Sequence, residues 1–108
     1  MNKRISNFRY ACKNYAVQKR WCEAYEKINL IQDVGETLEL SRYRILKSNI
    51  EYVDKQFKNI ENNHGAFAKE LIWECFVEGC KQEELAQIYG LSLRTIQRRF
   101  HEWLSCIE

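Results

Sequence analysis

The residues best suited to chemistry lie near the carboxyl end of the chain, in residues 92–101. At helical spacing Arg94, Gln97 and Arg98 share one face of this stretch, which contains no acidic residue. Arginine and glutamine side chains form paired hydrogen bonds with guanine and adenine edges, and the major groove of DNA admits one α-helix. The pattern therefore predicts a helix that contacts the bases of double-stranded DNA. The alternative is a helix whose basic face is only solvated.

The residues before this stretch predict how the helix is held. Ala86 lies on one face of a short helix expected over residues 81–89, where a small side chain lets a second helix approach closely. Gly90 follows at the place where a sharp turn needs a positive φ angle. Ser92 is a good N-cap, because its hydroxyl can accept a hydrogen bond from an early backbone N–H of the next helix. The residues expected to hold this motif together are Leu85, Ala86, Gly90, Leu91, Ile96 and Phe100.

The second helix, expected over residues 92–104, has one apolar and one polar face. A helix of this kind buries its apolar stripe against a core. The expected buried side chains are Ile96, Phe100, Trp103, Leu104 and Ile107. Side chains near the start and flank of the helix are expected to meet phosphate, together with exposed backbone N–H groups. These are Ser92, Thr95, Arg99 and His101.

Three short segments resemble a known DNA-binding family. Glu84-Leu85-Ala86, Gly90-Leu91-Ser92 and Thr95-Ile96 are similar to the helix-turn-helix of the sigma-factor domain that recognises the −35 promoter element, and Glu78-Gly79 resembles the link before it. The resemblance covers residues 67–104. It implies base contacts by Arg94, Gln97 and Arg98, and phosphate contacts by Ser92 and Thr95.

The same resemblance limits what the protein can be. The Leu-Pro pair that often opens the sigma-factor domain is absent, and no segment resembles the part that recognises the −10 element. A complete primary sigma factor is therefore excluded. A short helical chain that ends in such a domain is also similar to the phage late-gene transcription activators of the ArpU and RinA type, which implies a phage or prophage origin.

Proline is absent and glycine occurs only at positions 35, 65, 79 and 90. Because proline breaks helices and glycine often ends them, these positions divide the chain into helical segments. The expected segments are 1–34, 36–64, 66–78, 80–89 and 91–108. The sequence thus predicts an all-α protein. Residues 1–62 are expected to form a helical hairpin, and residues 66–108 a three-helix unit that contains the helix-turn-helix.

Apolar residues predict how the first two helices pack. In the first helix a stripe of Ile5, Phe8, Cys12 and Tyr15 shifts phase to Trp21, Tyr25 and Ile28, so this helix is expected to rotate its buried face or to break near residues 18–20. In the second helix a regular heptad seam is formed by Tyr43, Leu46, Ile50, Val53, Phe57 and Ile60. We favour packing of this seam against the first helix. Ile45 and Tyr52 lie on another face and leave a homodimer open.

Residues 1–20 hold six Lys or Arg and no acid. This basic segment is either a solvated face or an arm that contacts the nucleic-acid backbone. The net charge of the whole chain is only +2, which is low for a DNA-binding protein.

Several classes of protein are not expected. The five cysteines are odd in number, form no CxxC pair and are accompanied by only two histidines, so we expect reduced, buried thiols and no metal. No local motif groups residues for nucleophilic catalysis, and neither an enzyme nor a cofactor is expected. His64 is expected in a polar turn with Gly65.

No apolar run reaches the roughly 20 residues of a membrane span, and the amino end lacks the pattern of a secretory signal. A cytoplasmic protein without membrane contact is expected.

The leading interpretation is a sequence-specific transcription regulator that binds double-stranded DNA, with RNA polymerase and a second copy as further partners. One alternative is a protein-interaction module that docks on RNA polymerase or another protein without recognising a DNA sequence. Another is an accessory domain of a recombinase or transposase.

Overall fold

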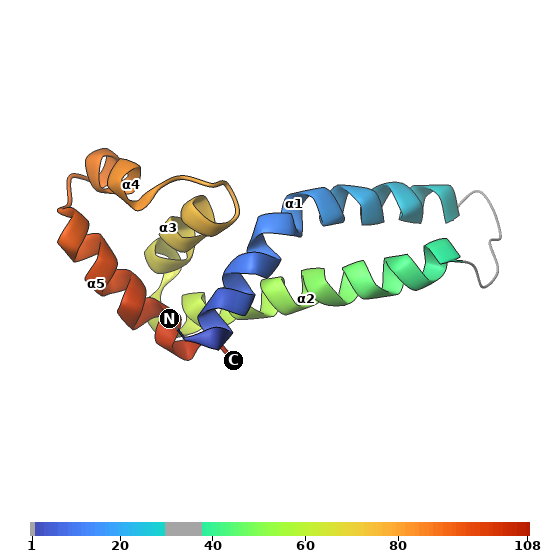
Figure 1. The fold of residues 1–108 in the computed structure, drawn as a ribbon, viewed down its shortest axis with the longest axis horizontal. Coiled ribbons are helices and arrows are strands. Elements are labelled where there is room, and N and C mark those ends of the chain that lie inside the picture. The colour runs from blue at the N-terminus through green and yellow to red at the C-terminus, as the bar shows by residue number, and fades with distance from the viewer. Residues whose placement is uncertain (1, 30–37) are drawn as a thin grey trace.

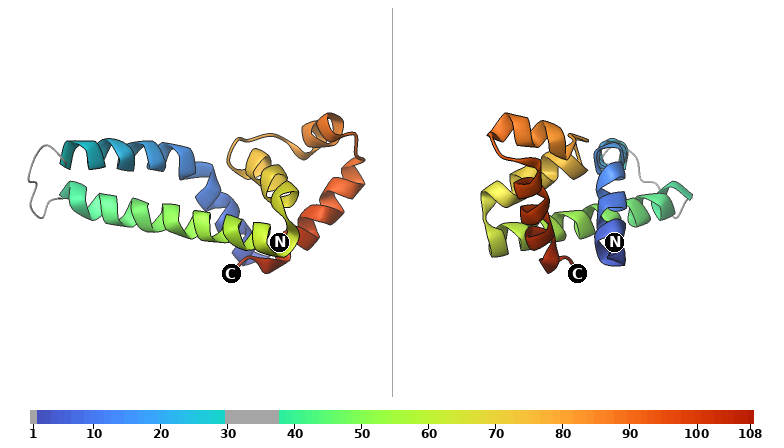
Figure 2. Two further views of the ribbon diagram at one scale, coloured as in Figure 1. Left: turned by 180° about the vertical axis from the view of Figure 1, so that it is seen from behind. Right: turned by 60° about the vertical axis from the view of Figure 1, so that its left-hand side comes forward.

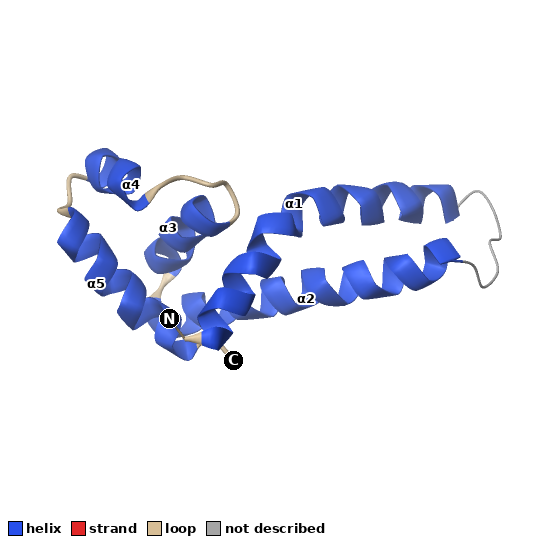
Figure 3. Ribbon diagram, viewed as in Figure 1, coloured by secondary structure: helices blue, strands red, loops and turns tan. Residues whose placement is uncertain are grey.

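A computed structural model of the protein describes residues 2–29 and 38–108. Within these residues the chain is helical apart from short links and contains no strand, which confirms the all-α prediction (Figure 3). The helices are α1 (Lys3–Asn29), α2 (Leu38–His64), α3 (Ala66–Phe76), α4 (Gln82–Tyr89) and α5 (Leu93–Trp103), followed by a short 3-10 helix, η1 (Leu104–Cys106). Gly35, which was expected to separate the first two helices, lies outside the described residues.

Helices α1 and α2 lie side by side and antiparallel, and the three shorter helices gather at one end of this pair (Figures 1 and 2). The predicted seam of α2 is buried at Ile50, Val53, Phe57 and Ile60 and partly buried at Tyr43 and Leu46. Two of its rings contact α1: Phe57 packs against Phe8 and Tyr43 against Tyr25. Of the two residues outside the seam, Tyr52 packs edge-on against Phe8 of α1, with ring centres 6.4 Å apart. Ile45 remains 70% exposed.

The buried face of α1 follows the predicted stripe except at two positions: Phe8, Cys12, Tyr15 and Tyr25 are buried as expected, and Trp21 is partly buried. The helix does not break near residues 18–20, although its axis bends (Figure 1). Its buried side chains include Phe8, Cys12, Tyr15 and Cys22, whose separations of four, three and seven residues keep them on one side of the helix. The prediction overlooked Cys22 and assigned Ile28 to the buried stripe, whereas Ile28 is 53% exposed.

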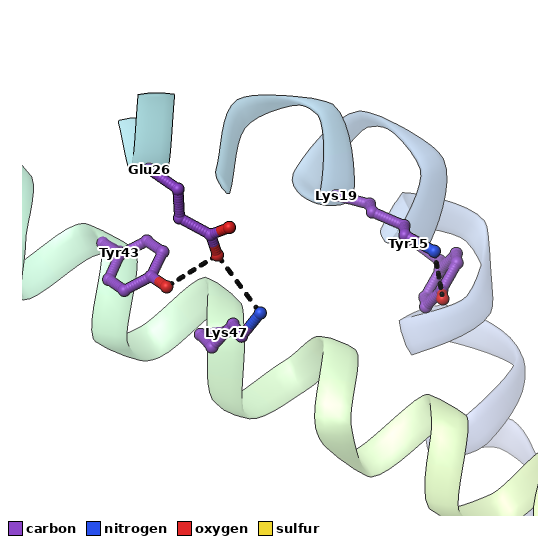
Figure 4. A network of polar contacts seen from close by, with 5 residues as sticks. All are labelled: Tyr15, Lys19, Glu26, Tyr43 and Lys47. Carbon is purple, nitrogen blue, oxygen red and sulfur yellow. Dashed lines mark hydrogen bonds and ion pairs between the residues drawn. The ribbon is translucent and has the colours of Figure 1, made fainter. Parts of the chain in front are cut away.

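Polar side chains join α1 to α2 at three levels along the pair. At the middle level the Asn49 side-chain nitrogen donates to Gln18 Oε1 (2.6 Å). Glu26 accepts hydrogen bonds from the Tyr43 hydroxyl (2.7 Å) and from Lys47 Nζ (3.2 Å), as Figure 4 shows. These two bonds hold the pKa of the Glu26 carboxyl below its usual value. Nearer the three short helices, the Tyr15 hydroxyl donates to Asp54 (2.7 Å).

The carboxyl end of the chain is fastened to α2. The Gln56 side chain is buried, its amide oxygen accepts from the Glu108 backbone N–H (3.1 Å), and its amide nitrogen donates to the Glu108 backbone carbonyl (3.4 Å). A single cluster of buried apolar side chains includes residues from all five helices and η1. The segments 1–62 and 66–108 therefore share one core.

All five cysteines belong to this core or pack against it. All five cysteines are free thiols; Cys12 and Cys22 are buried, and Cys75, Cys80 and Cys106 are partly buried. Burial raises the pKa of the Cys12 thiol to about 12, which keeps it protonated. His64 is the last residue of α2 and not part of a polar turn, because Gly65 alone (φ 96°) separates α2 from α3. Among the described helices, none is long and apolar enough to cross a membrane.

Candidate nucleic-acid interface

The turn between α4 and α5 has the geometry expected from the sequence. Gly90 ends α4 in the left-handed conformation, with φ 65° and ψ 32°. A β-carbon at this position would meet no atom within 4 Å, so the backbone angles and not a lack of space favour glycine. The Leu91 N–H donates to the Ala86 carbonyl (2.9 Å), a bond that closes the last turn of α4.

Ser92 caps α5, as its sequence position predicted. Its Oγ accepts a hydrogen bond from the Thr95 backbone N–H (3.1 Å) and donates one to Thr95 Oγ1 (2.8 Å). The Thr95 hydroxyl keeps its own proton, which it can still donate to an acceptor outside the protein. The first turn of α5 contains no acidic residue, so its N-terminal end retains a positive electrostatic character.

The opposite face of α5 is fixed in the core. Ile96, Phe100 and Trp103 are at most 8% exposed, and the predicted contact residues Leu85 and Ala86 of α4 are buried with them. Leu91, expected to fill the corner, is partly buried against the same cluster.

Helix α3 supports this pair of helices. The Tyr89 hydroxyl at the end of α4 donates to the Glu74 carboxylate of α3 (3.0 Å). Near the start of α3 the Phe67 ring meets Tyr89 and Trp103 edge-on, with ring centres 5.5 and 6.2 Å away. Rotation of α5 about its axis would break the Phe67–Trp103 contact and expose Ile96 and Phe100, so the direction of its outer face is fixed.

That outer face carries the predicted base-contacting residues. Arg94, Gln97 and Arg98 are exposed, and within the described part of the chain their side chains form no hydrogen bond or ion pair. His101 is exposed on the next turn and Arg99 is partly buried at the flank. Arg94, Gln97 and Arg98 thus share one face of one helix, and Ser92 and Thr95, which were predicted to contact phosphate, lie at its start.

Sequence reasoning did not identify a second cationic area. A groove of about 770 Å³ lies between α1 and the link from α3 to α4, and Arg9, Lys13 and Lys81 line it with the single acid Glu83. The Arg9 guanidinium lies over the Phe76 ring, 5.4 Å from its centre. The basic composition of residues 1–20 was the only signal in the sequence, and it could not show that Lys81 joins Arg9 and Lys13.

Helix α5 has 11 residues and is therefore about 16 Å long, which suits insertion of one end into a groove about 12 Å wide. Two guanidinium groups and one carboxamide on such a helix can donate to base edges or phosphates. Comparison with known proteins adds no assignment: the chain matches no family model, no curated protein and no solved structure.

Proposed function

We propose that this protein is a cytoplasmic transcription regulator that binds a specific sequence of double-stranded DNA. The observation that carries the proposal is the outer face of α5, where Arg94, Gln97 and Arg98 are exposed and have no partner in the described chain. The buried opposite face holds these three side chains toward solvent, where they are open to an outside partner, and their N–H groups match the acceptors that base edges present in the major groove.

In this proposal α4, the Gly90 turn and α5 form a helix-turn-helix, and residues 92–104 enter the major groove. Arg94, Gln97 and Arg98 contact bases. Ser92 and Thr95 at the start of α5, with Arg99 and His101 at its flank, contact phosphates and fix the orientation of the helix on the duplex.

The resemblance to the −35-recognising domain of sigma factors supports the same roles, and the resemblance to the ArpU and RinA activators supports a phage or prophage regulator that works with RNA polymerase. Selection of bound duplexes from a random library is the direct test. We expect one enriched motif; equal retention of all sequences would refute recognition by α5.

Variants then separate base contacts from phosphate contacts. Arg98→Ala should weaken binding of the selected site by about 1–3 kcal/mol and relax the preference at one base pair. Thr95→Ala should weaken all duplexes by similar factors, because phosphate contacts carry no sequence information. Lys58→Ala, an exposed cation of α2, is the matched control and should change neither property. Ile96→Asp should abolish binding together with the fold, since it buries an unpaired charge at a side chain with 0% exposure.

A homodimer is a further part of the proposal. Two copies would place their α5 helices in half-sites about 34 Å apart, or a multiple of that distance. On α2, Tyr43 and Phe57 of the seam and also Tyr52 already contact α1, whereas Ile45 is 70% exposed, so Ile45 is the residue most open to a second copy. Sedimentation equilibrium at micromolar concentration decides this point, because a strict monomer that binds one uninterrupted site would exclude it.

The second candidate is a protein-interaction module. Exposed apolar side chains on α1 and α2 favour it, and they include Tyr10, Val17, Ile28, Leu38 and Ile45. If duplex selection at low salt yields no motif, this candidate replaces the first.

A further inference from the structure

The outer side of α1 has its own apolar row, separate from the face that packs on α2. Tyr10, Val17 and Ile28 are 69%, 63% and 53% exposed. Their separations of seven and eleven residues place them on one side of the helix, opposite Phe8 and Cys12. Among the residues that the structure describes, none buries these three side chains, so they leave apolar surface in water along α1, a helix of 27 residues.

A row of cations runs beside these apolar residues. Lys13, Arg20 and Lys27 recur every seven residues, so they also share one side of α1. All three are exposed, and no ion pair or hydrogen bond engages their side chains in the described chain. Of the two acids of α1, Glu26 is bonded to α2, and Glu23 forms no ion pair with the cationic row.

The groove beside α1 continues the same surface. Tyr10 of the apolar row and Lys13 of the cationic row both line it, together with Arg9 and Lys81. Phe76 and Cys75 of α3 form an apolar part of its wall. The groove can therefore take an apolar side chain while cations surround it.

We propose that this face of α1, with the groove at its amino-terminal half, binds an acidic amphipathic helix of a partner protein. An apolar side chain of that helix would enter the groove, and its carboxylates would pair with Lys13, Arg20 and Lys27. Coiled-coil helices present parallel apolar and charged rows to each other, and opposite charges beside the apolar row select the partner.

Two other occupants fit the surface less well. Phosphates of DNA would satisfy the cations but would leave the apolar row against a polar backbone. An α1 helix of a second copy would bring another cationic row and no acidic one, and like charges brought together oppose association. The proposal does not rest on DNA recognition by α5.

The test begins with selection of displayed random peptides of about 20 residues, about 30 Å long as helices, on the full protein at about 0.1 M salt. We expect enrichment of peptides in which Asp or Glu flanks Leu or Phe at three- and four-residue spacing. An enriched peptide is then labelled and titrated by fluorescence anisotropy. The variant Lys13→Glu/Arg20→Glu should bind it at least about tenfold more weakly, because each opposing charge pair becomes repulsive.

The matched control Lys58→Glu/Arg98→Glu makes the same change of net charge at exposed positions of α2 and α5 and should bind the peptide like the parent protein. Val17→Ser should weaken binding, whereas Ile88→Ser, at a residue of α4 that is 67% exposed, should not. Circular dichroism of each variant should match that of the parent, since all these side chains are exposed.

Three results would overturn the proposal. The first is enrichment of peptides without acidic residues, or no enrichment. The second is an affinity that Lys13→Glu/Arg20→Glu leaves unchanged. The third is a different occupant: the same variant loses binding to random duplex DNA as strongly as Arg98→Glu does, or Val17→Ser converts a dimer to a monomer in sedimentation equilibrium.

Discussion

Replacing Gly90 by alanine should destabilise the protein through backbone strain alone. At φ 65° and ψ 32° the residue lies in the left-handed region, which costs an L-residue with a β-carbon about 1–2 kcal/mol. Alanine also restricts the unfolded chain, which returns about 0.4–1 kcal/mol. No contact is gained or lost, because a β-carbon would meet nothing within 4 Å. The net loss in the free energy of unfolding is therefore about 1 kcal/mol.

Thermal unfolding followed by circular dichroism measures this loss. For a chain of about 100 residues, 1 kcal/mol corresponds to a fall in Tm of about 4–8 °C. The Tm of Gly90→Asn should fall less than that of Gly90→Ala, because asparagine tolerates the left-handed region. The Tm of Gly90→Val should fall more, because β-branched side chains do not tolerate it. From most to least stable, the order at position 90 should be Gly, Asn, Ala, Val.

An alanine variant as stable as the parent would refute the strain argument. So would an asparagine variant as unstable as valine, since both results would mean that the turn does not require a left-handed residue. The folded Gly90→Asn protein should also keep the DNA preference of the parent, because the relative orientation of α4 and α5 is retained.

Four further substitutions test other contacts. Gln56→Ala should lower the free energy of unfolding by about 1–3 kcal/mol. It should also speed hydrogen exchange of the Glu108 backbone amide, because the Gln56 side-chain oxygen that accepts its hydrogen bond is removed. An unchanged exchange rate would contradict this. Tyr25→Phe should leave the free energy of unfolding in urea unchanged or raise it, because the buried Tyr25 hydroxyl has no hydrogen-bond partner in the described chain. Tyr43→Phe should lower it, because the bond to Glu26 is lost. Burial and the bond to Glu74 raise the pKa of Tyr89 to about 12, so the folded state favours the neutral phenol and stability should fall as pH rises from about 10 to about 12. Tyr89→Phe should show a smaller fall in Tm over that range.

The parts of the fold that the sequence predicted depend on neighbours along the chain. The turn at Gly90, the cap at Ser92 and the buried face of Ile96 and Phe100 each follow from residues within one or two helical turns. The heptad seam of α2 was predictable for the same reason, since a single helix contains the whole pattern.

The missed features depend on residues far apart in the sequence. Gln56 is a polar residue that is buried because Glu108, 52 positions later, completes its hydrogen bonds. Cys22 continues the buried face of α1, but its small side chain gave a weaker hydrophobic signal than the neighbouring Trp21. The groove needs Lys81 to lie opposite Arg9, a proximity that no local pattern contains.

Phe76 connects the two proposed binding surfaces. Its ring lies under the Arg9 guanidinium in the wall of the groove, 5.8 Å from the Phe8 ring of α1 and 6.3 Å from the Phe100 ring on the buried face of α5. A partner helix that displaced Arg9 from this ring would act on a side chain that also supports α5. Protein interiors are close-packed and transmit such displacements to the atoms in contact. A helix bound at α1 would therefore change the affinity of α5 for DNA only as far as it moves Phe76, and DNA would change the affinity for that helix by the same factor.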